Sequence, residues 1–415
     1  MRPEAGFAHV AVLAFVAART VPGFGFGVSL VGGTAIAHAT ERLGGRRGLA
    51  AGAAAAIESI AILGPARMSA PGGQLLTGPL IGHLAARGRS RALQVLSTAL
   101  VRAAFNLLLT WAFIAIFAGG LDNYTGTYDA TFGRIPGAPD GEAAALGGTA
   151  LALLIWAIGA SWVQVYVFHR ANERWSRGGG IDIDIAIDEA AHAAAPAIDE
   201  PPPPAVQRRF DPRAVIAAAA AAFVLLLAST DPLLLGAVAG WLAIAWLAAP
   251  AEREVVIPGL ILAATLAVGA FVTNWVGGDG VAAGIEHAVR GALLVMTATW
   301  MRGAAGTDGF RAVAQRLLGR LARRRGSRSA VELSLALDSL SGDRRMGEAI
   351  RELIADLRTA EDDFMRMLDA AIDWVAAEAS RFRPGVPAPA PQLAYRPPDL
   401  LVLIGACLPL AALAG

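Results

Sequence analysis

Apolar residues run along most of this chain in stretches that suit helices crossing a lipid bilayer. Such a helix needs about 20 predominantly apolar residues. Seven runs are clear, at 92–117, 145–168, 214–229, 233–249, 255–275, 285–301 and 399–414. Four weaker runs contain more glycine or polar residues, at 7–18, 28–39, 49–63 and 74–86. The pattern predicts an all-α, polytopic membrane helix bundle with about 11 transmembrane helices.

Arginine clusters between the runs orient this bundle, because cytoplasmic loops of membrane proteins are enriched in Arg and Lys. The clusters lie at 42–47, 87–91, 170–177, 208–213 and 311–328. If all of them are cytoplasmic, the spans alternate without conflict and the acidic loop 119–142 falls outside. We therefore expect a multi-pass protein of the inner (plasma) membrane, with its N-terminus cytoplasmic and its C-terminus extracytoplasmic.

A polar stretch divides the predicted spans into two groups. Residues 176–207 contain three consecutive glycines, an acidic run and four consecutive prolines. This composition cannot bury a core and indicates a disordered linker. The predicted membrane modules are therefore residues 1–175, with about six short helices, and residues 208–415.

The largest stretch outside the predicted spans is 303–384. From Asp343 to Arg381, apolar residues recur at a helical spacing of three and four positions, and charged residues occupy the other face. The sequence predicts one or two long amphipathic helices in the cytoplasm, within 329–383, before the last span at 399–414.

The basic residues exclude two kinds of catalysis. All 35 of them are arginines, so the chain has no lysine. The phosphate-binding loop of an ATPase needs a lysine, and so does Schiff-base chemistry. The single cysteine, Cys407, rules out a multi-cysteine metal site. We find no nucleophile–base pairing, and expect a non-catalytic membrane subunit without cofactor or metal, with any ATPase activity on separate subunits.

Polar residues inside the predicted spans of the first module are the candidates for binding a ligand. A charged side chain at the centre of a bilayer costs roughly 3 kcal/mol, so such residues usually face a cavity or a partner. Arg102 and Glu58 have a second interpretation, as a structural ion pair between helices. The candidates are Glu58, Gln74, His83, Arg102 and Asn106.

Short motifs recur in order along the second module. They are Arg209–Arg213 (Arg-Phe-Asp-Pro-Arg), Ser229–Pro232, Asn274 at the end of the third span, Arg290 early in the fourth, and Arg396–Asp399 before the last. Their order resembles that in the transmembrane T component of energy-coupling factor transporters, the CbiQ-like family. The first motif is similar to the family's His-Pro-Arg opening, with Asp211 in place of His, and the second to its Ser-x-Pro turn. The last resembles the basic-Asp opening of the family's final span.

The resemblance implies that the amphipathic helices are coupling helices, whose arginines dock onto two cytoplasmic ABC ATPase subunits. The matching positions are Arg358 in Leu-Arg-Thr and Arg381 in Ser-Arg-Phe, and neither keeps the family's glycine. The alternative is that both arginines lie on a solvated helix face. The span count and glycine-rich helices of residues 1–175 resemble a fused substrate-binding S component, although a separate S component is also compatible with the sequence.

The expected function is therefore the scaffold and coupling subunit of an ABC-type uptake transporter for a vitamin or a metal ion. It would transmit ATPase motion to a substrate-binding membrane module. The basic run 311–328 indicates contact with membrane lipids rather than nucleic acid. The rival hypothesis is a non-transporting assembly or signalling protein whose cytoplasmic helices recruit a partner.

Overall fold

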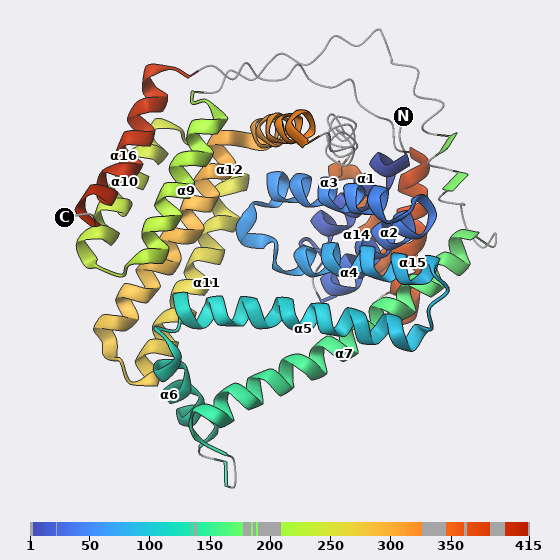
Figure 1. Cartoon of the computed structure of the whole chain (residues 1–415), viewed down its shortest axis with the longest axis horizontal. Coiled ribbons are helices and arrows are strands. Elements are labelled where there is room, and N and C mark those ends of the chain that lie inside the picture. Colours follow the sequence, from blue (N-terminus) through green and yellow to red (C-terminus); the bar gives the residue numbers. More distant parts are fainter. Residues whose placement is uncertain are drawn as a thin grey trace. The chain divides into compact units, whose positions relative to one another are not determined.

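The computed structural model describes residues 3–21, 23–133, 135–136, 139–176, 184–185, 188–189, 209–325, 346–360, 363–381 and 395–413. In this part of the chain there are fourteen α-helices, one short 3-10 helix and no β-strand. Figure 1 labels these helices along the chain. The predicted all-α class is confirmed.

The first half of the chain forms seven of these α-helices and the 3-10 helix η1. They are α1 (Pro3–Ala17), α2 (Gly25–Leu43), α3 (Gly45–Leu63), η1 (Pro65–Arg67), α4 (Ser69–Ala86), α5 (Arg91–Ile116), α6 (Leu121–Phe132) and α7 (Gly141–Ser176). The second half forms α9 (Pro212–Ala228), α10 (Pro232–Ala248), α11 (Arg253–Gly277), α12 (Gly280–Arg325), α14 (Met346–Thr359), α15 (Phe364–Arg381) and α16 (Pro397–Leu413).

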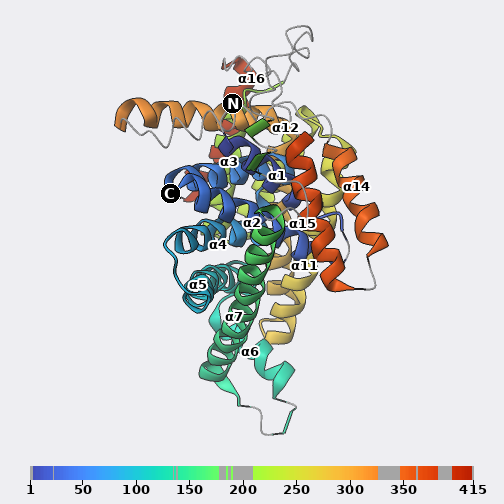
Figure 2. The ribbon, with the colours of Figure 1, turned by 90° about the vertical axis from the view of Figure 1, so that its right-hand side faces the viewer.

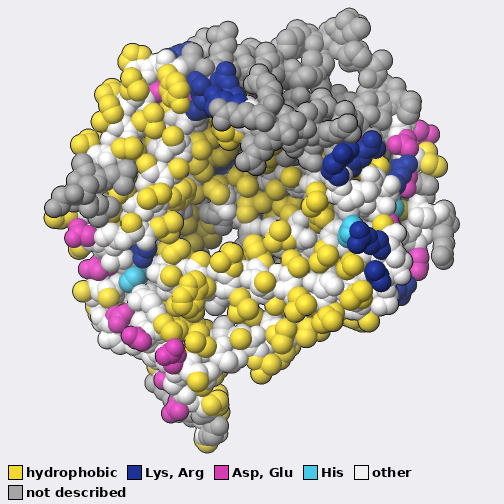
Figure 3. Space-filling view, viewed as in Figure 1, with side chains coloured by type: hydrophobic (Ala, Val, Ile, Leu, Met, Phe, Trp, Pro, Cys, Tyr) yellow, Lys and Arg dark blue, Asp and Glu magenta, His cyan; other side chains and the backbone are white. Residues whose placement is uncertain are grey.

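Four of the described helices are long and apolar enough to cross a membrane: α5, α7, α11 and the part of α12 from Gly280 to Leu318. Hydrophobic side chains are exposed along α5 and α7 (Figure 3). Leu100 of α5 and Trp162 of α7 are 60% and 62% exposed. The chain is thus a helical membrane protein. This count of four is lower than the predicted count of about 11 spans. The helices α1, α9, α10 and α16 are apolar but shorter. Glycine and polar residues interrupt the apolar sequence of α2, α3 and α4.

The helices group into two compact units, each of which combines segments from both halves of the chain. Unit 1 comprises Met1–Arg102, Ala157–Val206 and Phe310–Pro391. Unit 2 comprises Ala103–Trp156, Gln207–Gly309 and Gln392–Gly415. The amphipathic helices of the second half therefore belong with α1–α4, and α6 of the first half belongs with α9–α11.

Unit 1 is built around α1, in which every side chain from Glu4 to Ala17 is buried. Apart from Glu4 and His9, this helix is apolar on all sides, and such a helix is stable only when other helices surround it. Here α2 and α3 pack against α1, and α14 and α15 do so as well. The buried core joins side chains of α1 and α2 to Leu353 of α14 and to Ile372 and Val375 of α15.

Glycines let α2 and α4 approach closely within unit 1. A Cβ atom added at Gly82 of α4 would lie 2.0 Å from the carbonyl oxygen of Ala37 in α2. One added at Gly78 would lie 2.6 Å from the carbonyl oxygen of Gly33. Neither position therefore accepts a larger residue without separation of the two helices.

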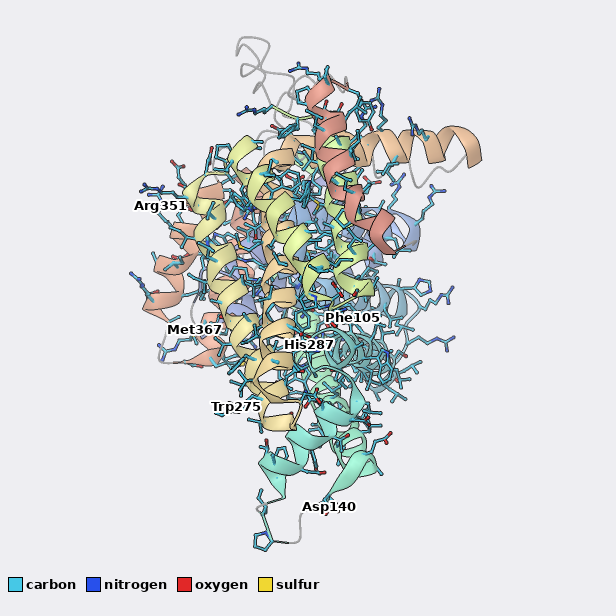
Figure 4. The ribbon with its side chains drawn as sticks, turned by 90° about the vertical axis from the view of Figure 1, so that its left-hand side faces the viewer. Phe105, Asp140, Trp275, His287, Arg351 and Met367 are labelled. Atoms are coloured by element: carbon cyan, nitrogen blue, oxygen red, sulfur yellow. The ribbon has the colours of Figure 1, made fainter. Side chains whose placement is uncertain are left out.

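The amphipathic region forms two helices, α14 and α15, which pack side by side (Figure 2). The periodicity predicts this helical structure correctly. The indole Nε1 of Trp374 in α15 donates to the carbonyl oxygen of Ala349 in α14 at 3.0 Å. Arg351 points away from the ribbon on the exposed side of α14 (Figure 4). We call α14 and α15 together the hairpin. The remaining positions of the predicted region 329–383 lie outside the described residues.

In unit 2, the motif residues at the two ends of the second half form one junction. The Asp211 carboxylate caps α9 by accepting from the backbone N–H of Arg213 at 2.8 Å. Asp399, in the first turn of α16, is fully buried. It accepts from the backbone N–H groups of Asp211 at 2.7 Å and of Arg396 at 2.6 Å. The segments before α9 and α16 are thereby tied together.

Asn274 and Arg290, two further motif residues, also join segments of unit 2. Asn274 of α11 donates from Nδ2 to the carbonyl oxygen of Phe117 at 2.8 Å and accepts from Asn123 of α6 at 2.9 Å. Arg290 of α12 is buried and donates to three backbone carbonyl oxygens, those of Leu226, Leu227 and Ile116. Asp211, Asp399, Asn274 and Arg290 therefore each have a structural role inside this unit.

Candidate functional site

The structure brings together only two of the five predicted ligand-binding residues. Gln74 of α4 and Arg102 of α5 belong to one buried cluster in unit 1. Glu58 of α3 lies elsewhere in that unit, His83 is half-buried in the last turn of α4, and Asn106 falls in unit 2.

The alternative ion pair between Glu58 and Arg102 is wrong. The Glu58 carboxylate pairs instead with Arg311 of α12, which donates from Nη2 at 2.5 Å and from Nε at 3.2 Å. Both side chains are buried. Arg311 follows Gly306, where a φ of 59° interrupts the helical conformation of α12. This pair holds the second part of α12 against α3, which is a structural role.

Gln164 of α7 lies at the centre of the buried cluster, and sequence reasoning missed it. Its Oε1 accepts from Thr77 Oγ1 at 2.8 Å and from Arg102 Nη2 at 2.5 Å. Gln74 is next to it: a Cβ atom added at Gly33 would lie 2.9 Å from Gln74 Oε1 and 3.2 Å from Gln164 Nε2. We call Gln74, Thr77, Arg102 and Gln164 the polar cluster.

Three polar atoms of this cluster have no hydrogen-bond partner among the residues that the structure describes: Gln74 Oε1, Arg102 Nε and Gln164 Nε2. The side chains themselves are 1%, 5% and 0% exposed. Buried polar atoms are normally satisfied, so three without partners in one cluster make it the candidate site of unit 1.

A polar face continues along α5 from the cluster. Gln94, Thr98 and Arg102 are spaced four residues apart and are all buried, so they share one side of the helix. Gln94 Oε1 lies 3.0 Å from Nε2 of His169 in α7. This spacing is the sequence signal that could have identified Gln94 and Thr98 as members of the same polar face.

The hairpin is attached to α7 by two bidentate ion pairs, and Arg174 also lies 3.5 Å from Asp369. Arg170 donates to both carboxylate oxygens of Asp369, from Nε and Nη2, at 2.6 Å each. Arg174 does the same to Asp373 at 2.9 and 2.5 Å. The indole of Trp175 donates to the carbonyl oxygen of Ile372 at 3.2 Å. The arginines are four residues apart in α7 and the aspartates are four residues apart in α15, so both pairs can form at the same time.

The two predicted coupling arginines have different surroundings. Arg358 is exposed near the end of α14 and has no ion pair or hydrogen bond among the described residues. Arg381 pairs with Glu352 of α14 and lies 3.7 Å from Glu378. Its hydrogen bond to Glu352 raises the pKa of Arg381. Only Arg358 therefore has its guanidinium available for a partner.

Two short pieces of the predicted linker contact α2. The Asp184 carboxylate lies 3.1 Å from His38 Nε2 and 2.7 Å from Arg42 Nη1, and Asp188 lies 2.8 Å from Arg42 Nη2. Burial alone would raise the pKa of Asp184, but its hydrogen bonds with His38 and Arg42 lower it. The predicted disorder of 176–207 otherwise concerns positions outside the described residues.

Comparison of the chain with protein-family models, with curated proteins and with solved structures finds no match. The likeness to T components therefore rests on the motifs and their order. Function must be inferred from the hairpin and from the polar cluster.

Proposed function

We propose that the chain is the membrane-embedded coupling subunit of an ABC-type uptake transporter of the energy-coupling factor kind. In this proposal the hairpin transmits the motion of cytoplasmic ATPase subunits to the helices of unit 1, which bind the transported compound. One observation carries the proposal: the hairpin is joined to α1, α2 and α7 by apolar packing and by two ion pairs.

A coupling element needs one surface for the motor and another for the part it moves. The inner surface of the hairpin holds Leu353, Leu368 and Ile372 in the core of unit 1. Its outer surface exposes Arg351 and Arg358. A guanidinium group suits the outer contact, because its planar fork of donors binds carboxylates and carbonyl oxygens in a fixed orientation.

The source of energy must lie on other chains in this proposal. The sequence contains no lysine, so it cannot form the ATP-binding loop of an ABC ATPase. The proposed partners are two cytoplasmic ATPase subunits at the outer surface of the hairpin. Because unit 1 already holds helices that contact the hairpin, unit 1 takes the place of a separate S component.

The test is co-purification of the full chain with the ATPase subunits encoded nearest to its gene. Arg358→Glu should abolish the association, because it reverses the charge of the available arginine. Arg89→Glu is the matched control, since Arg89 is exposed in the loop before α5 and lies outside the hairpin. Full retention of the ATPases by Arg358→Glu would refute this coupling role.

The second candidate is a non-transporting assembly or signalling protein that recruits a partner through the hairpin. Two observations favour it. The glycine of the T-component coupling motif is absent after both Arg358 and Arg381. Arg381 also forms an ion pair with Glu352 inside the hairpin. Under this hypothesis the co-purified partner depends on Arg358 but contains no ATP-binding loop.

A further inference from the structure

Arg102 brings a positive charge into unit 1 without a negative charge to balance it. Its side chain is buried and lies on α5, one of the four helices that are long and apolar enough to cross a membrane. It donates to the neutral Gln164 side chain, and no carboxylate pairs with it among the described residues. A buried charge is unfavourable unless it is paired. A bound anion would supply the missing partner.

The arrangement around Arg102 suits an anion that carries oxygen atoms. Arg102 Nε and Gln164 Nε2 are buried donors without an acceptor in the part of the chain that the structure describes. Gln74 adds an amide beside them, which can present either its oxygen or its NH₂ group after rotation. A guanidinium and one or two amide donors are typical ligands of a carboxylate or a phosphate. A free metal cation does not suit a cluster whose single charged member is positive.

The position of Arg102 along α5 distinguishes a dissolved compound from a lipid. Arg102 lies eleven residues after Arg91, where this 26-residue helix begins. At 1.5 Å per residue, the separation is roughly 16 Å along the helix axis. The hydrocarbon core of a bilayer is about 30 Å thick, so Arg102 is near its middle when α5 spans the membrane. Lipid phosphates lie at the surface of the bilayer and are therefore too far away.

We propose that the polar cluster binds the carboxylate or phosphate group of a small water-soluble compound. Arg102 provides the charge, Gln164 and Gln74 provide amide groups, and Thr77 holds Gln164 in place through its hydroxyl hydrogen bond. The idea that this compound is the transported cargo rests on the proposed function. The idea that the cluster binds an anion rests only on the geometry of the cluster.

The experiment uses the full chain purified in a neutral detergent. The protein is incubated with a polar metabolite extract of the cells that produce it, washed and denatured, and the released compounds are identified by negative-ion mass spectrometry. Phospholipids are extracted and measured separately. Arg102→Gln removes the charge. Thr40→Val is the control, because Thr40 is buried in α2 outside the polar cluster and its hydroxyl donates to the backbone oxygen of Ile36.

We expect at least one water-soluble acid to be enriched on the wild type and on Thr40→Val. Its amount on Arg102→Gln should fall at least about tenfold, the loss expected for one charged hydrogen bond. Arg102→Lys keeps the positive charge but lacks the planar guanidinium group, so it should retain an amount of the acid between those of the wild type and Arg102→Gln. This variant provides the comparison if Arg102→Gln does not elute as a folded protein. Equal retention by all the proteins, enrichment of phospholipid alone, or no enriched acid would overturn the proposal.

The outcome is independent of the ATPase experiment. An acid that binds through Arg102 to a chain without ATPase partners would preserve the anion site and refute transport. ATPase partners without a bound acid would preserve the coupling role and refute the anion site.

Discussion

Removal of the two ion pairs that attach the hairpin to α7 should loosen the hairpin without unfolding it. The variant is Asp369→Asn with Asp373→Asn, which keeps the side-chain shapes and removes both negative charges. The carboxylates are 22% and 42% exposed, and the arginines Arg170 and Arg174 are 33% and 30% exposed. Solvent therefore weakens each pair, but the two-pronged geometry strengthens it.

We assign about 1 kcal/mol to each pair, so the double variant should destabilise docking of the hairpin by about 2 kcal/mol. Because each 1.4 kcal/mol corresponds to a factor of ten, the equilibrium for local opening should shift by about thirtyfold. The apolar contacts of Leu353, Ile372 and Val375 stay in place and keep the hairpin helical.

Amide hydrogen exchange of the detergent-solubilised chain measures this opening directly. Peptides from 346–381 should exchange about thirtyfold faster in the double variant, whereas peptides from α9 and α10 should be unchanged. Asp363→Asn is the control, because Asp363 pairs with Arg366 inside the hairpin and does not reach α7. Identical exchange of 346–381 in the wild type and the double variant would refute the assignment of the two pairs as an attachment.

Two further substitutions test the packing inside each unit. Gly82→Ala places a Cβ atom 2.0 Å from a backbone carbonyl oxygen of α2, so it should destabilise unit 1 by about 2 kcal/mol in thermal unfolding followed by tryptophan fluorescence. Gly147→Ala is the control and should cause no such loss of stability, because no atom lies within 4 Å of the added Cβ. An equal loss in both variants would contradict the close approach of α2 and α4. Arg290→Gln leaves buried carbonyl oxygens of unit 2 without donors and should cost about 2 kcal/mol or more in the same assay, so an unchanged stability would argue against the three hydrogen bonds.

The sequence predicts the helices better than their partners. The spacing of apolar residues from Met346 to Val375 identifies the hairpin, because one face of an amphipathic helix must be buried wherever it packs. The surface that covers it could not be predicted, since α1 has no polar face that would distinguish its neighbours. The pairing of Glu58 with Arg311 likewise joins residues far apart in the chain, and charge alone does not select Arg311 over Arg102.

The sequence identifies only some residues of the candidate site, because a single polar residue does not reveal its neighbours in the fold. Arg102 and Gln74 stand out because polar side chains are rare inside apolar helices. Gln164 and Thr77 are equally buried, but an isolated glutamine or threonine in a helix gives a weak signal without its neighbours. The four-residue spacing of Gln94, Thr98 and Arg102 is the clearest pattern that sequence reasoning left unused.

The most direct test of the coupling role is the side of the membrane on which the hairpin lies. In a chain whose exposed Cys407 is replaced by alanine, a single cysteine at position 351 places a thiol on the exposed surface of α14. A membrane-impermeant thiol reagent should label it only after the cells are made permeable, because a cytoplasmic ATPase must reach this surface. Labelling of the same thiol in intact cells would place the hairpin outside the cytoplasm and contradict the proposed function.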